Sequence, residues 1–476
     1  MTWPVFRPVI RGSFILFMAL QIACGSLLNE TARINDLASG KNAGNTGKAA
    51  SSDKALTSLY FDQAVTGLST TYSGTFSGNN ITVRLPYGLG LTALKPSFST
   101  TGKAVMVGAV QQVSGVTANN FSGTLIYTVV AEDGTTQNYN VSIFQISGLQ
   151  DTGQAACYGM GVPLGACNDN TFPNQDADFT NWPNARTVQT QTTNPGYPAD
   201  DINRDPLNGI VWKTCSQGAS GSSCATGSPG SQTQAAASSA CLGLNSGAGY
   251  AGLQGWRLPT AIELMQLQHF LTGGVYFDQA VFPAAPGFNH WSSTVLTTGN
   301  GIQILGNYSA VATGTANRVK CVAGGAYPAP SFFDQGDGTV LDQRTGLVWQ
   351  KCAAGQTNDA TCSGGPVTAV TWSQALINCK NLNLAGRTWR VPNMMEAFTL
   401  INPGAASAPF IDSARFPNFP PAGTPTPRMW TSTTLPTNST YAYVIDYSTV
   451  SSATIDAKNA SLTGANRYYG RCVSGP

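Results

Sequence analysis

The sequence has little charge and almost no histidine. Charged residues make up 10% of the 476 residues, and the two histidines are His269 and His290. The formal net charge is +2 and no basic cluster occurs, which excludes nucleic acid as an expected partner. Gly, Ser, Thr and Asn fill the polar positions, a composition typical of extracellular modules with many turns. A chain of this length predicts about three domains.

From residue 150 onward one pattern occurs twice, which predicts a first copy over 150–327 and a second over 331–476. Each copy has Gly-x-Val-Trp-x-x-Cys, then Trp-Arg-x-Pro, then Trp-Ser/Thr-Ser-Thr, and closes on a cysteine. Both histidines lie in the first copy, so a Ser-His-Asp site or a histidine zinc site cannot be shared by the two copies. The repeated motif residues are Trp212, Trp256, Arg257, Glu263 and Trp291 in the first copy, and Trp349, Trp389, Arg390, Glu396 and Trp430 in the second.

The N-terminal segment 1–24 is predicted to be an export signal, because Arg7 and Arg11 precede a short apolar run. Its end resembles a bacterial lipoprotein signal, in which Cys24 becomes the lipid-bearing first residue of the mature protein. Gln21 departs from that pattern, since leucine is usual at this place. Looser signals of this kind are common in spirochaetal lipoproteins. An ordinary secretory signal is the alternative.

The segment 25–53 is rich in Ser, Gly, Asn and Lys and has no apolar periodicity, so it is expected to be a flexible tether. A lipid at Cys24 would hold this tether on a membrane. We therefore expect an exported protein that is lipid-anchored in the cell envelope, at the outer membrane or the cell surface.

The cysteine count is the main evidence for an oxidising compartment. Eleven cysteines are present, and ten remain once Cys24 is set aside for lipid. An even set in an exported protein indicates disulfides rather than a cysteine zinc site. Ten cysteines allow many pairings. Spacing favours three short bridges and leaves two long ones: Cys157–Cys167, Cys215–Cys224 and Cys352–Cys362, then Cys241–Cys321 and Cys379–Cys472.

The segment 54–147 alternates apolar and polar residues, as half-buried β-strands do. The turn at Asp133-Gly134 lies between the alternating runs 125–129 and 139–143, which predicts a hairpin because glycine accepts the backbone angles of a tight turn. Without a cysteine or a helical stretch, this segment is predicted to be a small all-β sandwich. It resembles the immunoglobulin-like or cadherin-like repeats of bacterial surface proteins.

The Trp-Arg-x-Pro, Trp-Ser/Thr-Ser-Thr and final Arg/Lys-Cys-Val signatures of both copies resemble the Lcl C-terminal domain family. That family takes its name from collagen-like bacterial adhesins and is abundant in spirochaetal lipoproteins. The sequence has no Gly-X-Y repeat, so the trimeric stalk of those adhesins is not implied. A bridge from a helix to the last strand is similar to the long disulfide of C-type-lectin-like folds. The expected architecture is therefore an immunoglobulin-like all-β sandwich followed by two disulfide-stapled α+β repeats.

Glu263 and Glu396 are the natural candidates for acid–base catalysis, because each follows a Trp-Arg-x-Pro segment. Each also lies three residues after Thr260 or Asn393, which is the spacing of a capping box at a helix start. Capping accounts for both glutamates without any catalytic role. Thr371 and Gln374 have the same spacing before a helix that carries Cys379 on its apolar face.

Arg257 and Arg390 are expected to stack on core tryptophans or to join a structural ion pair. Asp334 and Asp337 allow a calcium interpretation, but glycines stand at the third and fifth positions where ligands are needed. A turn is the favoured interpretation. We expect no metal and no cofactor.

Three classes of function follow from these observations. The first is an envelope lipoprotein that presents duplicated lectin-like modules for extracellular binding or adhesion, to a host matrix protein or a glycan. The second is a structural envelope protein without a specific ligand. The third is an enzyme related to formylglycine-generating folds, which use a reactive cysteine pair; fold similarity does not carry activity, and such chemistry needs free thiols. We expect no enzymatic activity.

Overall fold

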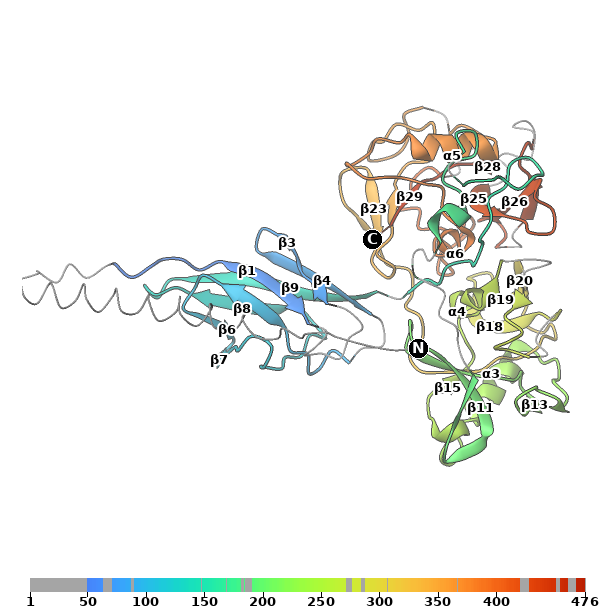
Figure 1. The fold of residues 1–476 in the computed structure, drawn as a ribbon, viewed down its shortest axis with the longest axis horizontal. Helices are drawn as coiled ribbons and strands as arrows, with labels where there is room; N and C mark the ends of the chain where they lie inside the picture. Colours follow the sequence, from blue (N-terminus) through green and yellow to red (C-terminus); the bar gives the residue numbers. More distant parts are fainter. Residues whose placement is uncertain are drawn as a thin grey trace, which may run out of the picture.

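The structure is a computed structural model, elongated in outline, with a β-rich unit at one end and two larger lobes at the other (Figure 1). The expected signal 1–24, with Cys24, and most of the tether 25–53 lie outside the described residues. Among the residues described, no helix is long and apolar enough to cross a membrane. The structure describes residues 49–62, 71–86, 90–146, 148–167, 169–180, 184, 191–270, 276–283, 287–305, 307–365, 367–419, 428–450, 454–460 and 468–475.

The N-terminal unit consists of two β-sheets around one core. The sheets have the strand orders β2-β1-β5 and β3-β4-β9-β8-β6-β7. Ile81 and Val83 of β4 and Val141 of β9 are fully buried in this core, as the period-two alternation predicts. The strands are β1 (Leu56–Phe61), β2 (Tyr72–Ser73), β3 (Thr75–Ser77), β4 (Asn80–Pro86), β5 (Ser97–Thr100), β6 (Ala104–Val107), β7 (Val110–Gln111), β8 (Leu125–Val130) and β9 (Thr136–Ile146).

The predicted hairpin is confirmed. Strands β8 and β9 pair in antiparallel fashion from Val130 opposite Thr136, and Gly134 in the turn has a φ of 84°. Strand β9 also pairs with β4, in parallel, which alternation alone does not reveal.

The first copy contains a five-stranded sheet, β10-β11-β12-β21-β15, and a three-stranded sheet, β18-β19-β20. Its short 3-10 helices are η1 (Asp176–Phe179) and η2 (Tyr250–Gly252), and its α-helices are α3 (Gln234–Gly243) and α4 (Ala261–Gln266). Its strands are β10 (Gln191–Asn194), β11 (Tyr197–Asp205), β12 (Ile210–Lys213), β13 (Ala219–Ser220), β14 (Thr226–Gly227), β15 (Trp256–Arg257), β16 (Gln268–His269), β17 (Tyr276–Phe277), β18 (His290–Val295), β19 (Asn300–Leu305), β20 (Asn307–Ala312) and β21 (Val322–Ala323).

The second copy repeats this plan with the sheets β22-β23-β24-β29 and β27-β26-β25-β28. Helix α5 begins as predicted, because Thr371 and Gln374 form a complete capping box, and its buried face carries Cys379. The helices are α5 (Trp372–Lys380) and α6 (Met394–Phe398). The strands are β22 (Phe332–Asp334), β23 (Thr339–Asp342), β24 (Val348–Gln350), β25 (Arg428–Thr434), β26 (Tyr441–Asp446), β27 (Thr454–Ala457), β28 (Tyr468–Tyr469) and β29 (Val473–Ser474).

The ten cysteines between 157 and 472 form five disulfides, and their partners are those that the spacing favours. Each long bridge ties a helix, α3 or α5, to the residue just before the final strand of its copy, so it closes a loop of 80 or 93 residues. The pairs are Cys157–Cys167, Cys215–Cys224, Cys241–Cys321, Cys352–Cys362 and Cys379–Cys472.

The two copies share one hydrophobic core, which includes buried residues of both. Phe270 of the first copy meets Tyr443 of the second edge-on, with ring centroids 5.2 Å apart. Tyr308 of the first copy meets Phe398 of the second in the same way at 4.8 Å. Helices α4 and α6 also contact each other. The copies therefore hold a set orientation and are not separate modules on a flexible linker.

Residues 149–180, called the strap below, form the beginning of the first copy in sequence but lie mainly against the second (Figure 1). The side chain of Gln154 donates a hydrogen bond to the Thr434 carbonyl (2.7 Å) and accepts one from the Thr434 amide (2.9 Å). The ring of Phe172 lies 6.0 Å from that of Trp372. The strap thus crosses from one copy to the other, which the sequence boundaries do not show.

Candidate functional site

The six tryptophans of the repeated motifs all lie in the interior of the two copies. None is more than 2% exposed, so none can serve as a stacking surface for a ligand. The tryptophans are Trp212, Trp256, Trp291, Trp349, Trp389 and Trp430.

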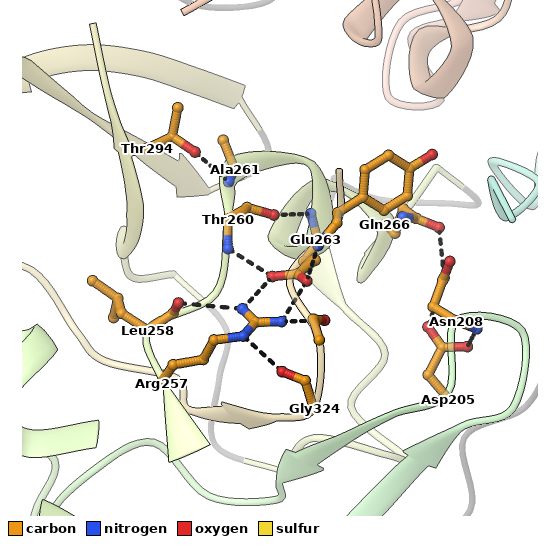
Figure 2. A network of polar contacts seen from close by, with 12 residues as sticks. Asp205, Asn208, Arg257, Leu258, Thr260, Ala261, Glu263, Gln266, Thr294 and Gly324 are labelled. Carbon is orange, nitrogen blue, oxygen red and sulfur yellow. Dashed lines mark hydrogen bonds and ion pairs between the residues drawn. The ribbon is translucent and has the colours of Figure 1, made fainter. Parts of the chain in front are cut away.

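Glu263 and Arg257 form the centre of a polar network in the first copy (Figure 2). The guanidinium of Arg257 donates to both carboxylate oxygens of Glu263, at 2.8 and 2.7 Å. The backbone amides of Thr260 and Tyr327 donate to the same carboxylate, at 2.7 and 2.8 Å. Four hydrogen bonds use the roughly four acceptor positions that a carboxylate has. The carboxylate therefore has no free position for proton transfer or a ligand.

The second copy repeats the network almost group for group. Arg390 donates to both oxygens of Glu396, each at 2.5 Å, and the amide of Asn393 donates to Glu396 at 2.9 Å. Phe179 of the strap covers the guanidinium, with its ring centroid 5.0 Å from the Arg390 Cζ. Both glutamates complete capping boxes at α4 and α6, as the spacing predicts.

Of the two roles expected for the arginines, stacking on tryptophans or joining an ion pair, the structure shows the ion pair. Arg257 pairs with Glu263 and Arg390 with Glu396, so each glutamate caps a helix and neutralises an arginine at once. The signal was present in the sequence, because arginine and glutamate are six residues apart in both copies. A bidentate pair of this kind is geometrically specific.

A second polar anchor joins each copy's hairpin turn to the end of its short helix. In the first copy Asn208 donates to Asp205 (3.0 Å) and to Gln266 (3.3 Å), as Figure 2 shows. In the second copy Arg344 donates to both oxygens of Asp342 (3.0 Å each) and to the Thr399 carbonyl (2.7 Å). The two anchors occupy equivalent positions in the two copies, but the donor is a neutral amide in the first and a charged guanidinium in the second.

The acidic pair considered for calcium forms a turn. Asp334 accepts a hydrogen bond from the Gly336 amide at 3.0 Å and pairs with Lys351 at 2.7 Å, and Asp337 caps the Thr339 amide. Within the described part of the chain, no group of three or more His, Cys, Asp or Glu side chains could hold a metal ion.

Ser216 and His290 lie within hydrogen-bond distance, at 3.2 Å, but both are buried. Burial lowers the pKa of His290 to about 3, with the nearby cations Lys320 and Arg318 adding to the effect. The imidazole is therefore neutral at physiological pH. In the second copy Met429 stands where His290 would align, so this contact belongs to the first copy alone.

Each copy also buries one cation just before its last cysteine, a feature that the sequence analysis noted only as part of a motif. Lys320 donates to the Thr214 carbonyl, and its Nζ lies 4.2 Å from the ring centroid of Phe282. Arg471 donates to the Gln350 carbonyl at 2.7 Å. Burial lowers the pKa of Lys320 well below its usual value and that of Arg471 to about 10. These cations donate hydrogen bonds to backbone carbonyls inside the fold.

A cleft of about 370 Å³ with polar lining lies between the N-terminal unit and the second copy. Phe333 presents its ring there and is 54% exposed. The hydroxyls of Thr75, Ser77 and Thr82 make no hydrogen bond to other residues that the structure describes. The cleft, called the interdomain cleft below, is lined by Thr75, Ser77, Thr82 and Arg84 of β3 and β4, and by Phe333, Gln335, Leu341 and Gln343 of the β22–β23 hairpin region.

Two family models match the chain. The Lcl C-terminal domain matches residues 201–323 and 338–474, one match in each copy. The model described as SGBP, N-terminal, matches residues 66–143, where the sequence analysis saw immunoglobulin-like or cadherin-like repeats. The interdomain cleft lies between residues within the SGBP, N-terminal, match and residues in or just before the second Lcl C-terminal match.

Two solved structures are similar to parts of the chain. One is a candidate glycoside hydrolase of Bacteroides thetaiotaomicron, with 20% identity over 36% of this chain and 37% of that one, at a TM-score of 0.17. The other is a candidate secreted protein of Bacteroides fragilis, with 15% identity over 19% of this chain and 94% of that one, at a TM-score of 0.15. The chain thus spans 37% of the length of the first structure. At these scores neither likeness bears on the fold. Comparison with the curated proteins found no match.

Proposed function

We propose, from the premise that the chain belongs to the Lcl C-terminal domain family, that it is a surface protein that binds an extracellular glycan in the interdomain cleft. The N-terminal match to the SGBP family supports a surface glycan-binding function. The observation that carries the proposal is the side-chain chemistry of the cleft. It combines one exposed aromatic ring with hydroxyl, amide and guanidinium groups.

These groups suit a sugar for a physical reason. A pyranose ring has an apolar C–H face and an edge of hydroxyls. The ring of Phe333 offers a flat apolar surface for the face. Thr82 and Gln343 can donate to and accept from hydroxyls, while Arg84 can donate only. A cavity of about 370 Å³ is within the usual range of ligand pockets.

The remaining parts of the chain serve presentation in this proposal. A lipid on Cys24 would anchor the protein to the envelope, and the tether 25–53 would hold it off the membrane. The N-terminal sheets would form the immunoglobulin-like unit, and the two copies would form a C-type-lectin-like pair. The protein would bind its ligand without turning it over, since the carboxylates of Glu263 and Glu396 are occupied.

The test is a glycan array probed with residues 49–476, followed by titration of the glycans that bind. Phe333→Ala should weaken binding about tenfold or more, because it removes the stacking surface. Phe76→Ala is the matched control, since Phe76 is exposed on β3 between two cleft residues but does not line the cleft. Binding to matrix proteins on the same array, with all glycans negative, would contradict the proposal. Equal loss in both variants would also contradict it.

A further inference from the structure

A second pocket lies between the two copies, close to the network of Figure 2. It has a volume of about 360 Å³ and is called the intercopy pocket below. Ala261, Thr294 and Ile302 line it from the first copy, and Arg344 and Pro403 line it from the second. The interdomain cleft and the intercopy pocket share no lining residue.

The internal repeat supplies a counterpart for this pocket. Thr294 and Thr433 end the same Trp-Ser/Thr-Ser-Thr motif, and each hydroxyl accepts a hydrogen bond from the first helical amide of its copy, Ala261 (2.9 Å) or Met394 (3.0 Å). On the opposite wall, Pro403 is seven residues after Glu396, as Phe270 is after Glu263. The counterpart of the intercopy pocket is thus the space between Thr433 and Phe270.

In the counterpart that space is filled by the strap. Thr152 accepts a hydrogen bond from the Phe270 amide at 2.9 Å, and Gln154 brackets Thr434 as described above. The hydroxyl of Thr433 donates to the carboxyl of Asp176 at 2.6 Å. An extended peptide with a carboxyl group beside it therefore occupies this position in the second copy.

The first copy has the same position open. The hydroxyl of Thr294 accepts from Ala261 but donates to no residue in the part of the chain that the structure describes. The chain's own strap cannot fill it, because the strap is already held at Thr433 and Thr434.

The intercopy pocket also differs in charge from its filled counterpart, because it is lined by an arginine where the counterpart has a leucine. Leu207 in the first copy corresponds to Arg344 in the second, two residues after Asp205 or Asp342. Arg344 is only 5% exposed, and its Nε and Nη2 are used by Asp342 and Thr399. Its Nη1 has no partner among the residues described, although the side chain lines the pocket. A guanidinium N–H without a partner at the wall of a pocket favours a carboxylate.

We propose that the intercopy pocket binds an extended segment of a partner protein that carries an aspartate or glutamate side chain. The segment lies as the strap lies in the second copy. Thr294 donates to it as Thr433 donates to Asp176, and the Nη1 of Arg344 binds its carboxylate. The remaining walls are aliphatic and proline-rich, with Ile262, Ile401 and Pro330, which suits a peptide better than a sugar.

The strap itself provides the probe. In the filled counterpart the side-chain amide of Gln150 donates to the Asp205 carboxylate (3.3 Å), and its backbone amide donates to the Gln266 side-chain oxygen (3.2 Å). In the second copy Arg344 makes the equivalent bonds to Asp342 and Thr399. Because Arg344 already makes these bonds, a peptide laid in the open pocket would bring its Gln150 position against the guanidinium, and an acidic residue there should strengthen binding.

The experiment titrates residues 49–476 with a labelled, end-blocked octapeptide of the sequence 149–156, made as Gln150, Q150E and Q150K forms. We expect saturable binding at one peptide per chain, at least fivefold tighter for Q150E than for Q150K. Ala329→Trp should abolish binding, because Ala329 is exposed at the pocket wall. Ala326→Trp is the matched control, since Ala326 is exposed on the same linker and does not line the pocket.

Three results would overturn the proposal: no binding of the Q150E form at millimolar peptide, equal binding of the Q150E and Q150K forms, or retained binding in Ala329→Trp with an unchanged melting temperature. Glycan binding that depends on Phe333 should be unaffected by Ala329→Trp, so failure of one proposal leaves the other testable. Loss of glycan binding in Ala329→Trp but not in Phe333→Ala would assign the intercopy pocket to the glycan instead.

Discussion

The two copies have the same framework, and they differ in how much of it is covered. In the first copy the side chain of Arg257 is 21% exposed beside Glu263, whereas in the second that of Arg390 is 6% exposed beside Glu396. The strap accounts for this difference, since Phe179 lies over Arg390, whereas the strap makes no contact of this kind with Arg257 among the residues described. One asymmetric segment thus makes one copy of a duplicated domain closed and leaves the other open. Duplication followed by partial coverage is a route to a new binding surface without new secondary structure.

The long disulfides should give the largest effect and should not distinguish the copies. Removing Cys379–Cys472 or Cys241–Cys321 by double alanine substitution should each cost about 4 to 5 kcal/mol, because loops of 93 and 80 residues lose similar entropy in the unfolded chain. Removing Cys352–Cys362, which closes 10 residues, should cost below about 3 kcal/mol. Denaturant unfolding measures all three. A larger cost for the short bridge would contradict the chain-entropy account.

Substitution of the two glutamates should destabilise the two copies to different extents. Glu396→Ala should cost about 3 to 5 kcal/mol, because it leaves Arg390 buried without its partner. Glu263→Ala should cost less, about 1 to 2 kcal/mol, because it removes the capping bond while water can still reach Arg257. Glutamine in either place keeps the bond to the capping amide but not the charge.

Capping alone predicts a cost of about 0.5 to 2 kcal/mol for alanine and almost none for glutamine. The ion pair predicts that Glu396→Gln is also clearly destabilising. Thermal melts of the four variants decide between the two accounts. Equal costs at Glu263 and Glu396 would show that the strap does not set the difference.

Asp176 makes the closed copy sensitive to pH. Burial, with help from Asp151 and Glu396, raises the pKa of Asp176 to about 7 against the hydroxyl bonds from Thr433 and Thr152. Because the pKa is higher in the folded than in the unfolded protein, the protonated carboxyl stabilises the fold. This contribution is fully present below the unfolded-state pKa near 4 and is lost as the pH rises through the folded-state pKa of about 7.

Asp176→Asn should remove that loss. Relative to the wild type, the variant should gain on the order of 1 kcal/mol or more between pH 5 and pH 8. Asp278→Asn in the first copy is the control, since the Asp278 carboxylate caps the Ala280 amide and makes no bond to Thr433 or to the strap among the residues described. If the melting temperatures of Asp176→Asn and the wild type change by the same amount between pH 5 and pH 8, Asp176 is not the source of the pH dependence.

The helices α3 and α5 give the smallest test. Gln374→Ala should cost about 0.5 to 2 kcal/mol, because it opens the capping box of α5. Helix α3 has Thr233 as its N-cap but Ala236, which is exposed, at the third position. Ala236→Gln should therefore stabilise the first copy by about 0.5 kcal/mol, measured by thermal melting. Destabilisation by Ala236→Gln would show that the two helix starts are not equivalent.

Local features were predictable from the sequence. The turn at Gly134, the cap at Thr371 and the helix position of Cys379 follow from spacing, since each depends on residues within a few positions. The pairing of Arg390 with Glu396 is nearly as local, and its repeat at Arg257 was the available signal.

Contacts between distant segments were not predictable. The shared core joins Phe270 to Tyr443, and the strap joins Asp176 to Thr433 across 257 positions. The periodicity of apolar residues does not identify such partners. It predicts that one face of a helix or strand is buried, but not which distant segment covers that face. The interdomain cleft has the same origin, since Thr82 and Phe333 belong to different domains.

The position of the strap has a mechanical consequence. A pull on the N-terminal end of the chain reaches the two copies first through residue 149, which is buried in their shared core. The load then acts on the hydrogen bonds of Gln150 to Asp205 and Gln266 in the first copy, and next on the pair between Gln154 and Thr434 in the second. Under tension at its N-terminal end, the molecule would therefore be loaded through the contact between the copies, and neither long disulfide loop would bear the force until that contact opened.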